Sequence, residues 1–197
     1  MSDPLIDADE DSTPLTPDER ADLIPSHITN RHELNAFEAR GVADGDQWAF
    51  SRRRGSLLSA EFLSQLHKRM FGGVWRWAGT YSKEVKRRIG VDRHLIEPQL
   101  RELCGTVRYW IDHESYAPDE IAVRFHHRLT QIHPYPNGNG RVARLAADVL
   151  IVELGSERFT WGRANLVEAA EARGAYVDAL HDADGNVIEP LIRFARS

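Results

Sequence analysis

The segment 132–144 has the sequence I-H-P-Y-P-N-G-N-G-R-V-A-R, in which a turn rich in asparagine and glycine precedes two arginines. Gly138 and Gly140 can adopt backbone angles that other residues avoid, so consecutive N–H groups can point into one concavity. A helix that starts after the turn would add its free N–H groups and the positive end of its dipole. Arg141 and Arg144 are one helical turn apart, so both guanidinium groups can face the same anion. This pattern predicts a cradle for a chain of phosphates.

His133 stands at the other edge of this turn and could act as a general base, because an imidazole with a pKa of about 6.5 accepts a proton at neutral pH. A turn of this composition is often only a connection, and a lone histidine before a proline is usually structural. The histidine, the turn and both arginines together favour a functional site. A metal hydrolase is a further interpretation, but His126 and His133 would lie two helical turns, about 10.5 Å, apart, too far to bind one ion directly.

The elements that must position this segment are predicted to be helices. Asn30 and Ser59 are typical N-caps, and Glu33 stands three residues after Asn30, as in a capping box. Pro98 is expected in the first turn of another helix. Apolar residues at helical spacing predict further helices at Pro118–Ile132, Arg141–Gly155 and Leu166–Leu180, with a short last one from Pro190. Residues 79–91 mix β-branched residues with lysine and arginine and predict a short hairpin or flap. The fold class is therefore mainly α.

The length and composition favour one domain in the cytoplasm. The 197 residues suffice for a core, and no apolar run approaches the roughly 20 residues that cross a bilayer. No signal peptide follows Met1, and a single cysteine excludes an intrachain disulfide. We therefore expect no membrane contact. Residues 1–22 carry eight acidic residues and one arginine, so 1–25 are predicted to be an acidic, loosely ordered leader and 26–197 the domain, with its core at about 60–155.

Residues 76–93 form a basic stretch, with six Lys or Arg against two carboxylates. Such a stretch could attract phosphates or nucleic acid, or it could be an ordinary solvated surface. We do not expect nucleic acid as the main partner.

The turn and its two flanking helix ends resemble the signature of the Fic family, H-x-F-x-(D/E)-G-N-G-R-x-x-R, with Tyr135 for phenylalanine and Asn137 for the acidic residue. Residues 77–79 (W-A-G) are similar to the Trp-Ala-Gly that precedes the family's flap. Residues 24–29 (I-P-S-H-I-T), the P-N-G-N-G turn and residues 190–195 (P-L-I-R-F-A) resemble the subgroup called mobile mystery protein B. The resemblance covers most of the chain and implies a Fic-type helical domain with a short β-hairpin flap.

The resemblance implies a transferase that moves AMP from ATP, its substrate, to a Ser, Thr or Tyr hydroxyl of a target protein. His133 would take the proton of that hydroxyl, the Asn139 side chain would position the phosphate under attack, and Arg141 would bind the β-phosphate. The implied nucleotide-binding set is Gly138, Asn139, Gly140, Arg141 and Arg144. A strand of the flap would pair with the backbone of the target, and the residues implied for this docking are Arg87, Arg88, Ile89, Gly90 and Val91.

Asn137 is the main departure from the signature. Mg²⁺ favours carboxylate oxygens, so an amide at this position makes a weak metal ligand, although the phosphates of ATP could still carry Mg²⁺. The transferred group could therefore be a different phosphate-containing group. A non-catalytic, nucleotide-binding regulator is a further alternative.

Regulation is also left open by the sequence. Many Fic domains are blocked by a helix with the pattern S/T-x-x-x-E-(G/N), whose glutamate pairs with the second arginine of the signature. Thr29 and Glu33 have this spacing, but Leu34 follows. We therefore expect any inhibitor to be a separate, antitoxin-like protein, with an internal inhibitor on Glu33 as the alternative.

Overall fold

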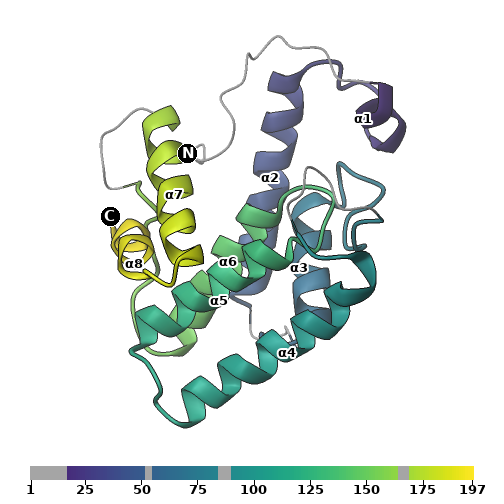
Figure 1. Cartoon of the computed structure of the whole chain (residues 1–197). Helices are drawn as coiled ribbons and strands as arrows, with labels where there is room; N and C mark the ends of the chain where they lie inside the picture. The colour runs from purple at the N-terminus through teal and green to yellow at the C-terminus, as the bar shows by residue number, and fades with distance from the viewer. Residues whose placement is uncertain (1–16, 52–54, 84–89, 164–168) are drawn as a thin grey trace.

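The structure is a computed structural model of the chain, and it describes residues 17–51, 55–83, 90–163 and 169–197. Its regular elements within these ranges are all helices (Figure 1), which confirms the mainly α fold class. None of the described helices combines the length and the apolar character that crossing a bilayer requires. The helices are α1 (Pro17–Asp22), α2 (Arg31–Ala49), α3 (Ala60–Phe71), α4 (Arg93–Asp112), α5 (Pro118–Ile132), α6 (Asn139–Glu153), α7 (Ala169–Asp184) and α8 (Glu189–Arg196).

Both predicted N-caps are confirmed. The Asn30 side chain accepts the Glu33 N–H at 3.0 Å, and the Glu33 carboxylate in turn accepts the Thr29 N–H at 2.7 Å. The Ser59 hydroxyl accepts the Phe62 N–H at 3.0 Å at the start of α3. Such bonds satisfy N–H groups that have no carbonyl partner in the first turn of a helix.

The helix α4 begins five residues before Pro98, at Arg93, so the prediction that Pro98 lies in the first turn is wrong. The proline removes the N–H that would bond to the His94 carbonyl, four residues earlier. His94 is exposed, so water can satisfy that carbonyl. The true N-cap, Asp92, is of a residue type favoured at this position, although its side chain makes no capping bond.

The helix α6 is the central helix of the domain. All of its residues from Val142 to Ile151 are buried, and it packs along α5. In Figure 1, α2 and α3 lie on one side of the α5–α6 pair, α7 and α8 lie on the other side, and α4 packs across α5. The turn that joins α5 to α6 therefore connects two helices that are held by neighbouring helices on several sides.

The helix α2 approaches α3 so closely that two glycines are needed at the contact. A Cβ added to Gly41 would lie 2.1 Å from the Met70 carbonyl oxygen, and one added to Gly45 would lie 2.4 Å from the Met70 Cγ. This close packing carries Glu38, one turn before Gly41, into the interior.

The segment assigned to the leader is partly attached to the domain. Its described end contains α1, after which Leu23 is buried and forms an isolated antiparallel bridge with Trp75. The Ile24 N–H also donates to the Val74 carbonyl at 2.8 Å. Residues 17–24 thus contact the loop that follows α3.

The flap was expected as a hairpin over residues 79–91. No strand is present in 79–83 or 90–91, and residues 84–89 lie outside the described residues. The flap hairpin is therefore still a prediction.

Candidate functional site

The helix α5 ends at His133, which has a left-handed backbone conformation with φ 51° and ψ 56°. Pro134 disfavours a helical conformation in the residue before it. The left-handed conformation costs a residue with a Cβ about 1–2 kcal/mol. The His133 N–H still donates to the Leu129 carbonyl at 3.2 Å. His133 thus occupies a strained, fixed corner between helix and turn, as functional residues often do.

The imidazole of His133 is suited to accept a proton. It is half-buried, and burial lowers its pKa below the ordinary value of 6.5, while a hydrogen bond with the Thr130 backbone acts in the opposite direction. Because burial disfavours the charged form, the ring is neutral at pH 7. A neutral imidazole can take a proton from a hydroxyl group brought within hydrogen-bond distance.

The two ends of the flap segment bracket His133. The Ser82 N–H donates to the Pro134 carbonyl at 2.8 Å, and the Val91 N–H donates to the Ile132 carbonyl at 3.2 Å. These bonds attach the chain before and after the flap to the two neighbours of the histidine.

Among the predicted docking residues, Gly90 lies directly against the histidine. A Cβ added to Gly90 would be 2.9 Å from the His133 Cβ, and Gly90 has a φ of +101°. Val91 follows it and makes the backbone bond described above. The other predicted docking residues lie outside the described part of the chain; these are Arg87, Arg88 and Ile89.

Position 138 requires a glycine for two reasons, its backbone conformation and the packing around it. It is the N-cap of α6 with a φ of 78°, and a Cβ at this position would lie 2.5 Å from the Phe71 ring. The same ring lies beneath the Arg141 guanidinium, whose central carbon is 4.6 Å from the ring centroid. Phe71 therefore supports the turn and the first arginine together.

Asn139 closes the turn with both polar atoms of its side chain. Its Oδ1 accepts the Tyr135 N–H at 2.8 Å, and its Nδ2 donates to the Tyr135 carbonyl at 2.7 Å. Asn139 is 4% exposed. In this geometry the side chain braces the loop, whereas the sequence led us to expect a direct contact with the attacked phosphate.

A buried histidine of α3, His67, joins the turn to the start of the flap. Its Nδ1 accepts the Gly79 N–H at 2.8 Å, which fixes the tautomer, and its Nε2 donates to the Asn137 carbonyl at 3.1 Å. The ring stacks on Tyr135 with centroids 3.9 Å apart. Burial lowers the pKa of His67 to about 4; the bond to Asn137 raises it and the charge of Arg141 lowers it. The neutral ring is therefore the form that holds both segments.

Asn137 is exposed, and its Oδ1 accepts the Gly138 N–H at 2.7 Å. Within the described ranges, no group of three or more His, Cys, Asp or Glu side chains is arranged to hold a metal ion. An amide oxygen already engaged in the turn is a poor ligand for Mg²⁺. The described side chains therefore do not fit a magnesium site of the protein's own.

Arg141 is held by Glu38 of α2. The Arg141 Nη1 lies 2.7 Å from the Glu38 Oε2, and the two side chains are only 12% and 6% exposed. The second carboxylate oxygen accepts the Trp75 indole N–H at 2.6 Å. Glu33, the residue considered from the sequence, instead caps α2. The first arginine of the turn thus already has an anionic partner.

Arg144 is 6% exposed and is turned towards α7. Its guanidinium carbon lies 5.6 Å from the Tyr176 ring centroid, and the Tyr176 hydroxyl is hydrogen-bonded to the His126 Nε2 at 3.0 Å. A Cβ added to Gly140 would lie 3.6 Å from the Arg144 Nη1, so the guanidinium folds back to the start of α6. Arg141 and Arg144 therefore flank the first turn of α6 from two directions.

The supporting residues Glu38 and His67 were not predicted, although each leaves a signal in the sequence. His67 shares an apolar helical stripe with Leu63, Leu66 and Met70, and Glu38 lies one turn after Leu34. A titratable residue within such a stripe must be paired when it is buried. Phe71 and Tyr176 left no comparable signal, since aromatic residues on helices are usually part of the core.

Comparisons with known proteins point to one family. Residues 57–151 match the Fic/DOC family. The chain is 26% identical over 147 residues to the protein adenylyltransferase fic-1 of Caenorhabditis elegans, a match that covers 70% of this chain and 26% of that protein. The chain thus spans only about a quarter of the length of that relative.

Two solved structures from Bartonella have a similar fold. The N-terminal Fic domain of a VirB-translocated effector from Bartonella quintana has a TM-score of 0.69 at 16% identity and covers 95% of this chain and 88% of that chain. The BepC effector of Bartonella tribocorum, solved with bound AMPPNP, has a TM-score of 0.65 at 14% identity and covers 90% of this chain and 95% of that chain. Both likenesses extend over most of the described helices.

Proposed function

We propose, from the premise that residues 57–151 form a Fic/DOC family domain, that this chain transfers AMP from ATP to a hydroxyl side chain of a target protein. The observation that carries the proposal is the strained His133 beside a glycine turn that leads directly into the N-terminus of α6. The name of the C. elegans relative supports the activity, and the AMPPNP bound to the BepC effector supports the donor. We also assign the chain to the mobile mystery protein B subgroup, on residues 24–29 and 190–195.

His133 is the proposed general base. A Ser, Thr or Tyr oxygen of the target attacks the α-phosphorus of ATP, and its proton passes to the neutral imidazole. The bond between the α-phosphorus and the bridging oxygen breaks, and pyrophosphate leaves. The bracketing of His133 by Ser82 and Val91 supports this assignment, because a target strand paired with the flap would pass beside the imidazole.

The turn and α6 are the proposed phosphate site. The N–H groups that follow Gly138 would hold the phosphates at a helix N-terminus. Arg141 and Arg144 would carry the charge that grows on the leaving pyrophosphate, where preorganised donors lower the barrier most. Asn139 would act as a positioning residue, since its side chain holds the turn closed.

Glu38 is the proposed inhibitory element, because Arg141 must exchange this carboxylate for a phosphate. We place inhibition in cis, on Glu38, ahead of the separate antitoxin-like protein expected from the sequence. The ion pair of 2.7 Å between mostly buried side chains supports this choice. A separate inhibitor would then act by stabilising the same pair.

Asn137 motivates a second candidate function, the transfer of a different phosphate-containing group. The exposed amide occupies the position where the family signature has an acidic residue, so metal-assisted AMP transfer has a weaker basis here than in other Fic domains. A nucleotide-binding regulator without catalysis is the third candidate.

Intact mass spectrometry separates these candidates. The protein is incubated with ATP, with and without Mg²⁺ or Mn²⁺, alone and in a cell lysate containing a tagged ATP analogue. An AMP adduct that is absent in His133→Ala supports the proposed function. A phosphate adduct, or an adduct formed only from another nucleotide, supports the second candidate. ATP binding without any adduct in either arm contradicts transferase activity.

A further inference from the structure

The structure contains an open recess of about 1310 Å³. Its walls come from the end of α1, from residues 76–83 and from the first turns of α4. In Figure 1 these segments lie together at one edge of the molecule, around the loops between α3 and α4. None of residues 133–144, all of which are described, lines the recess. The recess is therefore separate from the proposed phosphate site.

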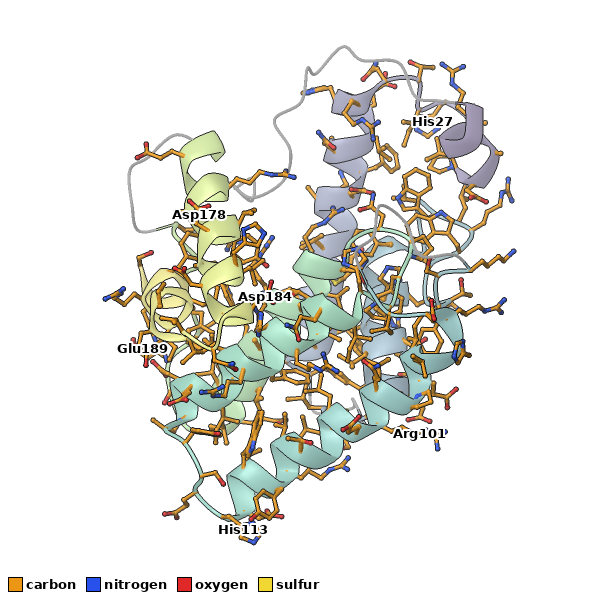
Figure 2. All side chains as sticks on the ribbon, viewed as in Figure 1. His27, Arg101, His113, Asp178, Asp184 and Glu189 are labelled. Atoms are coloured by element: carbon orange, nitrogen blue, oxygen red, sulfur yellow. The ribbon has the colours of Figure 1, made fainter. Side chains whose placement is uncertain are left out.

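The lining of the recess contains more cations than carboxylates. Arg101, which Figure 2 shows on α4, is paired with Glu97 at 2.5 Å. The exposed side chains of Arg76, Lys83 and Arg93 have no hydrogen bond or ion pair to another residue in the part of the chain that the structure describes. Asp22 is the second carboxylate of the lining, which leaves a net positive field in the recess.

The aromatic wall of the recess is held in place from behind. Trp77 stacks on Trp75 with ring centroids 5.1 Å apart, and its carbonyl accepts the Thr80 hydroxyl at 2.6 Å. Tyr81 is half-buried beside Tyr135, with centroids 6.1 Å apart. A ligand would therefore meet a preformed apolar surface beside exposed cations, a combination that favours binding at low ordering cost.

The recess lies next to the residues that bracket His133. Lys83 directly follows Ser82, whose N–H is bonded to the Pro134 carbonyl. Arg93 comes two residues after Val91, which makes the corresponding bond on the other side of the histidine. At about 3.5 Å per residue, the Cα atoms of Lys83 and Arg93 lie within roughly 10 Å of the backbone next to the imidazole.

We propose that this recess binds an acidic segment of the protein that is modified, roughly two to five residues from the target hydroxyl. This inference rests on the proposed function and deepens it, because it names the class of target. The carboxylates of the segment would pair with Arg76, Lys83 and Arg93, and its apolar atoms would pack on Trp77 and Tyr81. A nucleic acid fits less well, because Asp22 and Glu97 interrupt the cationic lining. A peptide can carry its carboxylates only where they face the cations, whereas a phosphate backbone is charged at every nucleotide.

The test uses two fluorescent peptides and the chain of residues 1–197. Both peptides contain one central serine; one carries glutamates around it, and the other carries glutamines at the same positions. Fluorescence anisotropy measures their binding to the wild type, to the double variant Lys83→Glu/Arg93→Glu and to Arg193→Glu, a single charge reversal at an exposed residue of α8. Circular dichroism and ATP binding check that each variant is folded.

We expect the glutamate peptide to bind at least tenfold more tightly than the glutamine peptide. The double variant should lose this preference, Arg193→Glu should keep it, and added salt should weaken it. Equal binding of both peptides to the wild type, or an unchanged preference in the double variant, would overturn the inference. Tighter binding of a single-stranded oligonucleotide than of the glutamate peptide, lost in the same double variant, would also overturn it.

The same samples separate this inference from the proposed function. Intact mass after addition of ATP reports whether the bound peptide or any other protein receives AMP. Charge-dependent binding without AMP on any protein supports the recess and counts against the transferase. AMP transfer at the same rate to both peptides and by both charge variants supports the transferase and counts against the recess.

Discussion

Glu38 and Arg141 are 103 residues apart in the sequence, yet their side chains meet at 2.7 Å between α2 and α6. The carboxylate is also bound by the Trp75 indole at 2.6 Å, so it is fixed from two sides. A phosphate that is to bind Arg141 must compete with this partner. Under the proposed function, the pair couples the position of α2 to the occupancy of the α5–α6 turn.

The variant Glu38→Gln should bind ATP more tightly than the wild type. The amide oxygen keeps the bond to Trp75, while the charge that holds Arg141 is lost. Removing one member of a buried pair costs up to about 3–5 kcal/mol of folding stability, so the variant without nucleotide should melt at a lower temperature. Calorimetric titration with ATP should show at least a fivefold gain in affinity, and ATP should raise the melting temperature more than in the wild type.

The matched control is Glu33→Gln, which alters a carboxylate that caps the same helix through an exposed hydrogen bond with Thr29. Its ATP affinity should equal that of the wild type. If Glu38→Gln bound ATP no better than this control, the pair with Arg141 would be structural and the inhibitory role would be wrong.

His67 should make the stability of the domain sensitive to acid. Because the pKa of His67 is about 4 in the folded chain and 6.5 without the fold, only the unfolded chain binds a proton between these values. The free energy of unfolding should therefore fall as the pH is lowered from 6.5 to 4, by at most about 1.4 kcal/mol per pH unit. Above pH 6.5 the imidazole of His67 is neutral in both the folded and the unfolded chain, so it no longer changes the free energy of unfolding with pH. His126 acts in the same direction, since burial lowers its pKa well below the ordinary value.

Urea unfolding of the wild type and His67→Gln at pH 7, 6 and 5 isolates this effect. Glutamine can donate to Asn137 and accept from Gly79, but it does not titrate. The loss of stability between pH 7 and pH 5 should be smaller in the variant. An identical loss in both proteins would show that His67 is not the group that responds.

Local chemistry explains why part of this fold and site could be predicted. Asn30 and Ser59 cap helices through neighbours three residues away, and Pro118 starts α5 as its fixed φ requires. The turn from His133 to Arg144 was recognised for the same reason, because glycines and a proline dictate its backbone within a few residues.

The contacts that support the site could not be predicted, because they depend on which helices become neighbours. The bond from His67 to Asn137 spans 70 residues, and the pair of Glu38 with Arg141 spans 103. Sequence spacing carries no information about such distances. The direction in which the Arg144 side chain points could not be predicted for the same reason, since its neighbour Tyr176 comes from α7.

The variant Asn137→Asp should strengthen metal-dependent nucleotide binding. The carboxylate can still accept the Gly138 N–H, so the turn should be kept, and it adds the charge that Mg²⁺ prefers. Titration of ATP with Mg²⁺ should show a severalfold gain in affinity over the wild type, whereas titration in EDTA should show none. If the variant and the wild type bound ATP with equal affinity in the presence of Mg²⁺, position 137 would not reach the metal.

Gly138→Ala should damage the turn far more than Gly155→Ala. Both glycines have a positive φ, 78° and 84°, so both variants carry a backbone strain of about 1–2 kcal/mol. Only at Gly138 does the new Cβ meet another group, the Phe71 ring at 2.5 Å, whereas nothing lies within 4 Å at Gly155. Chemical denaturation should give an additional loss of about 1–3 kcal/mol for Gly138→Ala, together with loss of ATP binding. Equal destabilisation by both variants would mean that the Phe71 ring can move away from the new Cβ at no cost in stability.

His133 should set the acid limit of AMP transfer at a pH below 6.5. Burial lowers the pKa of this imidazole, so the base is neutral and active at pH values where an exposed histidine would already be protonated. The dependence of kcat/KM on pH is the informative measurement, because it reports the free protein before the charge of ATP acts on the ring. We expect kcat/KM to rise with pH to a midpoint below 6.5 and to be flat between pH 7 and 8, and to be undetectable in His133→Ala. A midpoint above 6.5 would require a neighbouring anion that stabilises the charged ring, and burial would then not be the dominant influence on the base.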